Sequence, residues 1–295
     1  MKRFLTLALA VASVGFIAVG TASAVDTYIV GDGANGIGNS RHNLGSLGEH
    51  IRTGSTSEIC VFCHTPHHTN TANNLKPMWN RGTSAPASFT AYGTTIGGTS
   101  VDSSDIGSTS LACLSCHDGV TTFDNIVNAP GKKGVVTGGS DLGWSFSDVG
   151  LPASDFMTSS RLNIGLNLSN DHPVSVVYNA DRAGLRPTNT VISTINLTAD
   201  LATSSSTYDN GNMLKNLWAV KGYVSSTATI ADLLRDTKVE CSSCHDPHFN
   251  NKSFNEVDFS YAAEVSDQEP ESNGLFLRRV GGNTGSGLCR TCHNK

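Results

Sequence analysis

A short motif, Cys-x-x-Cys-His, occurs four times in this chain and uses all 8 of its cysteines. The copies lie at residues 60–64, 113–117, 241–245 and 289–293. Paired thiols at this spacing, followed directly by an imidazole, form the attachment signature of c-type haem. The thiols add across the porphyrin vinyl groups and the imidazole binds the iron. The sequence therefore predicts haem c as the cofactor, in four covalently bound copies.

Each motif supplies two kinds of site residue. The cysteines expected to form thioethers with haem are Cys60, Cys63, Cys113, Cys116, Cys241, Cys244, Cys289 and Cys292. The histidines expected to bind the iron from the proximal side are His64, His117, His245 and His293. No cysteine is left over for a lipid anchor or an interchain disulfide.

Two other kinds of site use cysteine pairs at this spacing. Two zinc ions could each take four thiolates, and redox disulfides of the thioredoxin type use the same pair. Neither alternative requires a histidine after the second cysteine in every copy. Histidine makes up 10 of the 295 residues, so four such coincidences favour haem attachment over zinc or disulfide chemistry.

The N-terminus has the three parts of a secretory signal peptide. Residues 1–3 carry positive charge, residues 4–20 are apolar, and residues 22–24 read Ala-Ser-Ala. We predict a signal peptide over 1–24, with cleavage favoured over retention as a membrane anchor. No later stretch is long and apolar enough to span a bilayer, so we expect no transmembrane span. The protein is expected to be secreted to the extracellular space or cell surface, with the periplasm as the alternative.

The rest of the chain, 25–295, is expected to form a single tetrahaem cytochrome domain. Aromatic residues make up 7% and charged residues 15% of the sequence, which is poor material for an ordinary core. Each haem adds a large apolar surface, so the cofactors can supply much of the missing core. We predict a mostly irregular, coil-rich fold organised by haem, with short helices and few short strands.

Local signals place a few regular elements. Cap-type residues and a following glycine predict a helix at 108–117, and a second helix is expected at 286–293. Short strands are expected at 174–178 and 275–280. The glycine-rich segment 31–38 follows no βαβ pattern and is not predicted to bind a nucleotide. The net charge of −5, without a basic tract, predicts no nucleic-acid partner.

The distal iron ligands are expected among the histidines outside the motifs. These are His42, His50, His67, His68, His172 and His248. These six histidines exceed the four distal positions by two. Methionine is the competing ligand, but Met78, Met157 and Met213 are too few to serve every haem. We therefore expect bis-histidine ligation, which lowers reduction potentials relative to methionine ligation.

His67 and His248 each follow a proximal histidine by three residues, with proline in between. Such a ring can hardly reach the opposite face of its own iron, and the proline turns the chain outward. Each ring is therefore expected to bind a different haem, which places two haems side by side. His68 is an alternate for His67. In Asn-Asp-His-Pro-Val, the ring of His172 could be oriented by Asp171 or by a backbone carbonyl.

The ordered series of motifs resembles a known family. In chain order it reads His-Asn-Leu from residue 42, Cys-Val-Phe-Cys-His-Thr-Pro-His from 60, Cys-Leu-Ser-Cys-His-Asp-Gly from 113, Asn-Asp-His-Pro-Val from 170, Cys-Ser-Ser-Cys-His-Asp-Pro-His from 241 and Leu-Cys-Arg-Thr-Cys-His from 288. The series is similar to the secreted OmcE-type tetrahaem cytochromes that polymerise into extracellular nanowires. The resemblance implies a coil-rich fold around a haem stack and bis-histidine ligation throughout.

The same resemblance implies a specific ligand set. The distal histidines it implies are His42, His67, His172 and His248, while His50 and His68 match no family position and stay as alternates. It also implies filaments in which one subunit gives a ligand to a haem of the next. By resemblance, that ligand is His67 or His68.

Three functions compete on these grounds. The first is an extracellular electron conduit that self-associates into a filament, and the second is a monomeric periplasmic or cell-surface electron shuttle. The third is a multihaem reductase, which needs an iron with an open position. The spare histidines disfavour an open position, so we expect electron transfer rather than an enzyme. Upstream and downstream redox proteins or extracellular electron acceptors are the expected partners.

Three arginines have two interpretations. Arg278, Arg279 and Arg290 either pair with haem propionates or are solvated surface charges, and the sequence favours neither.

Overall fold

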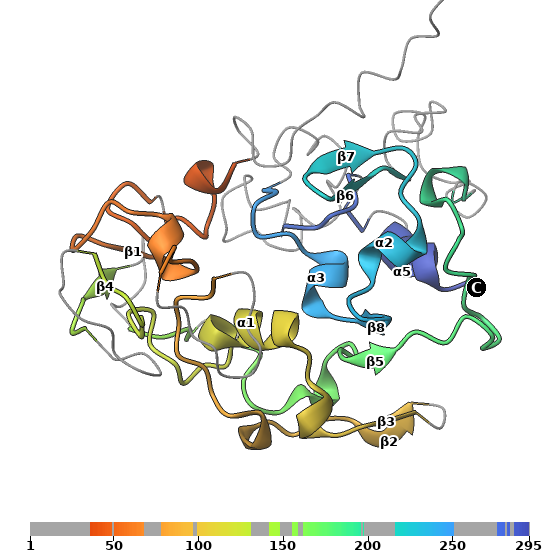
Figure 1. The fold of residues 1–295 in the computed structure, drawn as a ribbon, viewed down its shortest axis with the longest axis horizontal. Coiled ribbons are helices and arrows are strands. Elements are labelled where there is room, and N and C mark those ends of the chain that lie inside the picture. The colour runs from red at the N-terminus through yellow and green to blue at the C-terminus, as the bar shows by residue number, and fades with distance from the viewer. Residues whose placement is uncertain are drawn as a thin grey trace, which may run out of the picture.

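The computed structural model describes residues 36–48, 50–67, 78–96, 99–130, 142–147, 155–158, 162–195, 197, 216–250, 276–280, 282–283 and 286–294. The predicted signal peptide, the glycine-rich segment 31–35, His68 and Met213 lie outside these residues. Within them the chain forms short helices and two-stranded ladders joined by irregular segments (Figure 1). No helix in the described part has the length and apolar character needed to cross a membrane.

Three of the α-helices carry an attachment motif. Helix α1 spans Ser108–His117 and ends on the second motif, α3 spans Cys241–Cys244, and α5 spans Gly287–Cys292. Helix α1 matches the predicted bounds, and α5 is one residue shorter at each end than predicted. Gly119 follows α1 with φ of +72°, the left-handed conformation that glycine adopts most readily after a helix.

The remaining helical segments are shorter. Helix α2 spans Ile230–Leu233 and begins with a capping box, in which Thr229 and Asp232 each bond to the other's backbone. The 3-10 helices are η3 (Ile37–Asn39), η4 (Cys60–Phe62), η6 (Pro86–Ser88), η7 (Ser103–Asp105), η8 (Leu168–Asn170) and η9 (Ile192–Thr194). The first attachment motif begins on η4, so all the motifs start on a helical turn.

The strands pair into antiparallel ladders of two. These ladders are β1 (Arg52–Thr53) with β4 (Phe146–Ser147), β2 (Gly93–Ile96) with β3 (Thr99–Val101), β5 (Val176–Val177) with β8 (Lys238–Val239), and β6 (Trp218–Val220) with β7 (Tyr223–Ser225). The strand predicted at 174–178 is present as β5, shortened to two residues.

The strand predicted at 275–280 is not formed in the described part of that segment. Leu277 and Arg279 instead make isolated bridges, to His245 and to Trp218. The reason is a break in the extended backbone, because Phe276 has φ of +57°. A left-handed residue of this kind interrupts a ladder. The segment therefore touches two different partners where one continuous strand was expected.

The buried apolar side chains form several separate clusters, and these lie against the attachment motifs. One cluster packs Leu111 and Leu114 of α1. A second contains Phe62 and has Cys63 and Cys116 packed against it, and a third has Cys292 packed against it. The described residues thus form several small apolar clusters next to the motifs, where many domains have one continuous core.

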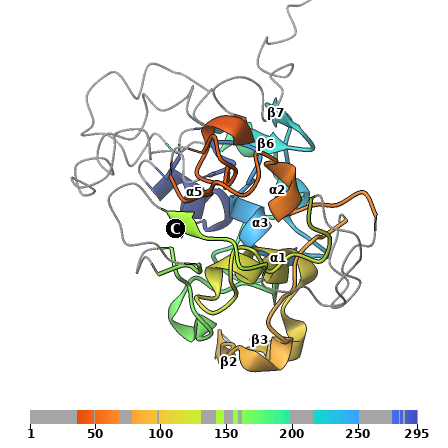
Figure 2. The ribbon, with the colours of Figure 1, turned by 90° about the vertical axis from the view of Figure 1, so that its left-hand side faces the viewer.

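Figure 1 shows the arrangement of these parts. The β1–β4 ladder lies at one side of the molecule, α2 and α5 lie at the other, and α1 and α3 lie between them. Figure 2, turned by 90°, again shows α1 directly beside α3. Residues of α1 and α3 are in contact, so the second and third motifs meet near the centre of the molecule.

Candidate haem centres

Each attachment motif is closed by a helical hydrogen bond. The histidine N–H donates to the carbonyl of the first cysteine, at 2.7 Å in the first motif, 3.0 Å in the third and 2.9 Å in the fourth. In the second motif the same residues lie within α1. Side chains three and four positions apart share one face of a helical turn. Two thiols and an imidazole are thereby directed to one side of the chain.

The thiols are not engaged with one another covalently. All eight cysteines are described and none forms a disulfide. The described residues also contain no group of three or more histidine, cysteine or acidic side chains gathered for a metal ion. The four cysteine pairs are therefore present as free thiols.

Consecutive motifs are neighbours in space. Burial raises the pKa of Cys63 to about 12, and the neighbouring Cys116 thiol adds to this shift. The thiols of Cys113 and Cys241 are close enough to interact, which raises the pKa of Cys113 and lowers that of Cys241. The first motif therefore lies beside the second, and the second beside the third.

The third and fourth motifs are close in the same way. Burial raises the pKa of Cys244 to about 12, and the nearby Cys292 thiol contributes. The motifs accordingly follow one another in space in the order in which they occur in the sequence. Cys60 and Cys289 are exposed, whereas the thiols of the two middle motifs are half-buried. The two ends of the series are thus the parts open to solvent.

His42 faces the proximal histidine of the second motif. The ring centroids of His42 and His117 lie 6.4 Å apart, with the planes inclined by 77°. The Nδ1 atom of His117 hydrogen-bonds to the Leu162 carbonyl at 2.7 Å, which leaves Nε2 available to a metal. Burial, with a smaller effect of His117, lowers the pKa of His42 to about 3 and keeps its ring neutral. Its Nδ1 is buried without a hydrogen-bond partner among the described residues.

His248 faces the proximal histidine of the first motif. The ring centroids of His64 and His248 lie 6.1 Å apart, with nearly parallel planes at 13°. The Nδ1 atom of His248 hydrogen-bonds to Oδ1 of Asp246 at 3.2 Å, so Nε2 is the nitrogen left for a metal. Trp79 packs edge-on against His64 at a centroid distance of 5.7 Å.

Both centroid separations are close to the spacing expected for two rings that share one metal. A metal bound to one nitrogen of each ring at about 2 Å holds the ring centroids about 6 Å apart. Rings in direct face-to-face contact are closer, as shown by His42 and Phe276, whose centroids are 4.1 Å apart. Each pair also has one Nδ1 bonded to a protein oxygen, the usual partner of a ligating histidine.

His172 lies on the side of the third motif. Its carbonyl accepts a hydrogen bond of 2.9 Å from Tyr92. Burial raises the pKa of Tyr92 to about 12, followed by effects of Asp171 and Cys241, so the tyrosine lies close to that motif. The His172 ring is exposed and its Nδ1 lies 3.0 Å from the Pro173 carbonyl. Of the two orienting groups predicted, the backbone carbonyl is the one in contact.

The remaining predicted ligands are His67, His50 and His68. His67 is exposed, and its carbonyl accepts a 2.9 Å hydrogen bond from the Thr65 hydroxyl. His50 is half-buried, and His68 lies outside the described residues. Among the methionines, Met157 is buried in the cluster around Phe62, and Met78 is exposed.

Arg278 and Arg279 are not solvated surface charges, whereas Arg290 is half-buried. Arg278 is buried and pairs with Asp246, and it also donates to the carbonyls of Ala219 and Ser242. Arg279 is likewise buried and donates to the Gly282 carbonyl. Arg290 donates to the Leu197 carbonyl. The acceptors of Arg278 are distant in sequence, so its burial could not be predicted from the sequence alone.

Two buried charged residues near the motifs were not predicted from the sequence. Arg81 has no exposed surface and donates to the carbonyls of Ser115, Thr122 and Phe123, which fixes the chain around the second motif. Glu240 accepts hydrogen bonds from Ser110 of α1 and, at 3.0 Å, from Ser175. In the sequence, the only feature that could have indicated a role for Glu240 is its position directly before the third motif.

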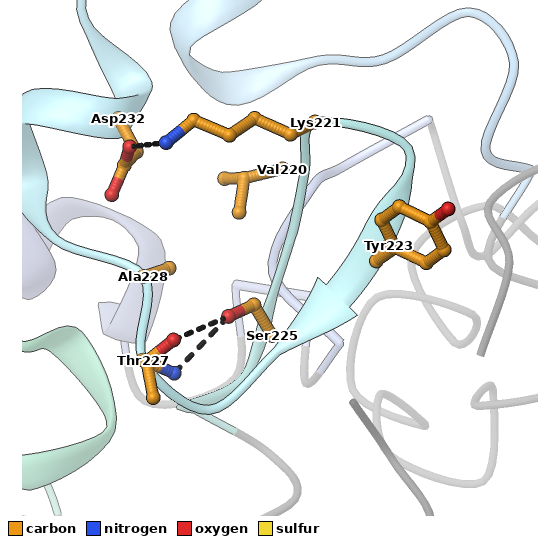
Figure 3. Close-up of a pocket in the computed structure, with 7 residues that line it drawn as sticks. All are labelled: Val220, Lys221, Tyr223, Ser225, Thr227, Ala228 and Asp232. Carbon is orange, nitrogen blue, oxygen red and sulfur yellow. Dashed lines mark hydrogen bonds and ion pairs between the residues drawn. The ribbon is translucent and has the colours of Figure 1, made fainter. Parts of the chain in front are cut away.

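A pocket of about 300 Å³ lies beside the β6–β7 hairpin (Figure 3). Its lining residues are Val220, Lys221, Tyr223, Ser225, Thr227, Ala228 and Asp232. An ion pair of 2.5 Å joins Lys221 and Asp232 across its edge. The pocket contains none of the predicted haem-site residues.

Comparison with known proteins adds no family assignment. No protein-family model matches the chain, and no curated protein matches it significantly. The description of the haem centres therefore depends on the motifs and on the geometry of the histidines.

Proposed function

We propose that this protein transfers electrons through four covalently bound, bis-histidine c-type haems. The observation that carries the proposal is the pair of imidazole separations, 6.4 Å for His42 with His117 and 6.1 Å for His64 with His248. Bound haem supplies reversible one-electron chemistry at its iron. The chain would contribute the thiols that hold each haem, the histidines that would bind its iron, and the apolar clusters that lie against the motifs.

The geometry supports a definite pairing of ligands. In the proposal His42 completes the coordination begun by His117, and His248 completes that begun by His64. His172 is assigned to the iron of His245, because Tyr92 joins its backbone to the region of the third motif. If two histidines bind each iron, no position on it is left for a substrate, which favours electron transfer over a reductase.

We further propose that the subunits associate end to end after secretion. Pairing three distal histidines within the subunit leaves His50, His67 and His68, of which the proposal assigns His67 to the fourth motif. His67 is exposed, and so is Cys289 of that motif, so both are accessible to a neighbouring copy. A ligand shared across the boundary would fix the distance between the last haem of one subunit and the first of the next.

The haem content is tested on protein made with a c-type maturation system. We expect the mass of the mature chain plus four haems, and optical and EPR spectra of low-spin ferric iron only. A chain that carries fewer thioether-linked haems, or zinc in their place, would overturn the proposal.

The end-to-end association needs a separate test. Gel filtration and electron microscopy of the native protein should show filaments, and the His67→Ala variant should be monomeric with one iron no longer low-spin. The His50→Ala variant serves as the control and should still polymerise. Monomeric wild-type protein with every haem low-spin would remove the filament from the proposal and leave a monomeric shuttle.

A further inference from the structure

The carboxylate of Asp246 makes three contacts that join a predicted iron ligand to a buried cation. Its Oδ1 accepts the backbone N–H of His248 at 3.0 Å and the Nδ1–H of the same residue at 3.2 Å. Its Oδ2 accepts from Nη1 of Arg278 at 3.0 Å. The carboxylate is thus held on both sides, and the imidazole has one preferred orientation.

Arg278 is in turn fixed by the protein. Its guanidinium donates to the Ala219 carbonyl at 2.6 Å and to the Ser242 carbonyl at 2.7 Å. Its own N–H donates to the Cys244 carbonyl at 2.8 Å, and the N–H of Asp246 donates to the Phe276 carbonyl at 2.7 Å. The position of Asp246 is therefore set by the third motif, although the ring that it holds faces the first motif.

The second imidazole pair has a different outer partner. His117 bonds through Nδ1 to the Leu162 carbonyl, which is neutral. The carboxylate next to it in sequence, Asp118, does not bond to that ring. Asp118 instead accepts from Ser84 at 2.7 Å and from the hydroxyl and N–H of Thr121 at 2.6 and 2.8 Å. The chain therefore offers one histidine pair with a charged partner and one with a neutral partner.

A carboxylate that accepts the Nδ1–H of a ligating histidine makes that ring a stronger electron donor. Stronger donation stabilises ferric iron and lowers the reduction potential. We propose that Asp246 is a positioning residue that orients His248 and lowers the reduction potential of the iron between His64 and His248. This inference rests on the proposed function, because it concerns the same iron. It implies that the iron bound by His64 and His248 has a lower reduction potential than the iron bound by His42 and His117.

The test is a redox titration of the holoprotein followed by EPR, with Asp246→Asn compared with wild type. Asparagine keeps an oxygen for the two His248 donors and removes the charge. We expect one of the four potentials to rise by about 59 mV or more, a tenfold change in the ratio of reduced to oxidised iron. We also expect the g values of one low-spin signal to move, because the donor strength of one ligand has changed.

Asp118→Asn is the matched control. It removes a buried carboxylate that also follows a proximal histidine but does not bond to a ligand ring, so its effect on iron is through space. We expect all low-spin g values to stay unchanged in this variant. A shift in potential that is equal in both variants, with the EPR signals unmoved in both, would overturn the role assigned to Asp246.

A second variant keeps the test decisive if Asp246→Asn folds poorly. Arg278→Gln removes the competing cation while keeping a hydrogen-bond donor for Asp246, so the same potential should fall and the same EPR signal should move. Unchanged signals in this variant also overturn the inference. Wild-type protein without four low-spin haems would instead overturn the proposed function, so the two failures are distinguishable.

Discussion

Phe276 lies flat against His42, with ring centroids 4.1 Å apart and planes inclined by 13°. The phenyl ring therefore covers one face of the imidazole that lies beside His117. Because Phe276 has φ of +57°, its backbone is held in the left-handed region to make this contact. A residue that the sequence assigned to a strand instead supports a predicted iron ligand.

Replacing Phe276 by alanine removes this support. A stacked aromatic pair contributes about 1 kcal/mol beyond the area that it buries, so the free energy of unfolding should fall by at least that amount. Guanidinium denaturation followed at the haem absorption band measures the change. Tyr223→Ala, which removes an aromatic ring that is 51% exposed, should change stability much less. Equal losses in the two variants would contradict the role of the stack.

Replacing His42 by alanine should open one axial position. The expected result is one five-coordinate, high-spin haem among four, visible as a new EPR signal and as binding of one carbon monoxide per reduced chain. His50→Ala is the matched control and should leave every haem low-spin. The opposite outcome, with high-spin iron in His50→Ala only, would identify His50 as the ligand and exclude the pairing of His42 with His117.

Glu240 should make stability depend on pH. Burial raises the pKa of this carboxyl above 4.5, despite the hydrogen bonds from Ser110 and Ser175. The folded state therefore binds the proton more tightly than the unfolded state. The stabilising contribution of the protonated group is fully present below pH 4.5 and is lost as pH rises through the folded pKa.

The variant Glu240→Gln tests this dependence, since the amide cannot titrate. Its unfolding free energy should fall less than that of wild type as the pH is raised from 4.5 toward neutrality. Chemical denaturation at several pH values measures both curves, with the exposed Glu58→Gln as the control. Parallel curves for wild type and Glu240→Gln would contradict the assignment.

The capping box of α2 should make stability depend on pH in the opposite direction, with stability lost as the pH falls. Burial works to raise the pKa of Asp232, but the hydrogen bonds from Lys221 and Thr229 outweigh it and lower the pKa below 3.8. Its contribution is present above the unfolded value and is lost as pH falls through the folded pKa. Thr229→Ala removes one half of the box and should cost about 1 kcal/mol at neutral pH.

Lys221→Ala provides the comparison for that prediction. The lysine side chain is 77% exposed, and exposed ion pairs contribute about 0–1 kcal/mol at most. In thermal unfolding, the Tm of Thr229→Ala should therefore be lower than the Tm of Lys221→Ala. The reverse order would assign the local stability to the ion pair at the pocket edge.

Local parts of this structure could be predicted from the sequence, because they depend on neighbouring residues. The helix 108–117 is an example, since its cap signals and Gly119 lie within a few residues of it. The partners of His42 and His248 could not be predicted in the same way, because each ring meets a motif distant in sequence. The burial of Arg81 was also missed, since its acceptors are carbonyls brought together by tertiary structure. The strand expected at 275–280 is interrupted by the left-handed backbone of Phe276, which the residue type does not signal.

The contact between Cys113 and Cys241 joins the ends of the longest interval between motifs, 118–240. The entropic cost of closing a loop rises only slowly with its length. Insertions in that interval would therefore enlarge the outer covering of the molecule without changing which attachment sites are adjacent. In the proposed electron carrier, the arrangement of the attachment motifs and the segments that surround them can consequently evolve separately. The loops are open to variation in surface chemistry while the spacing of the redox centres stays constant.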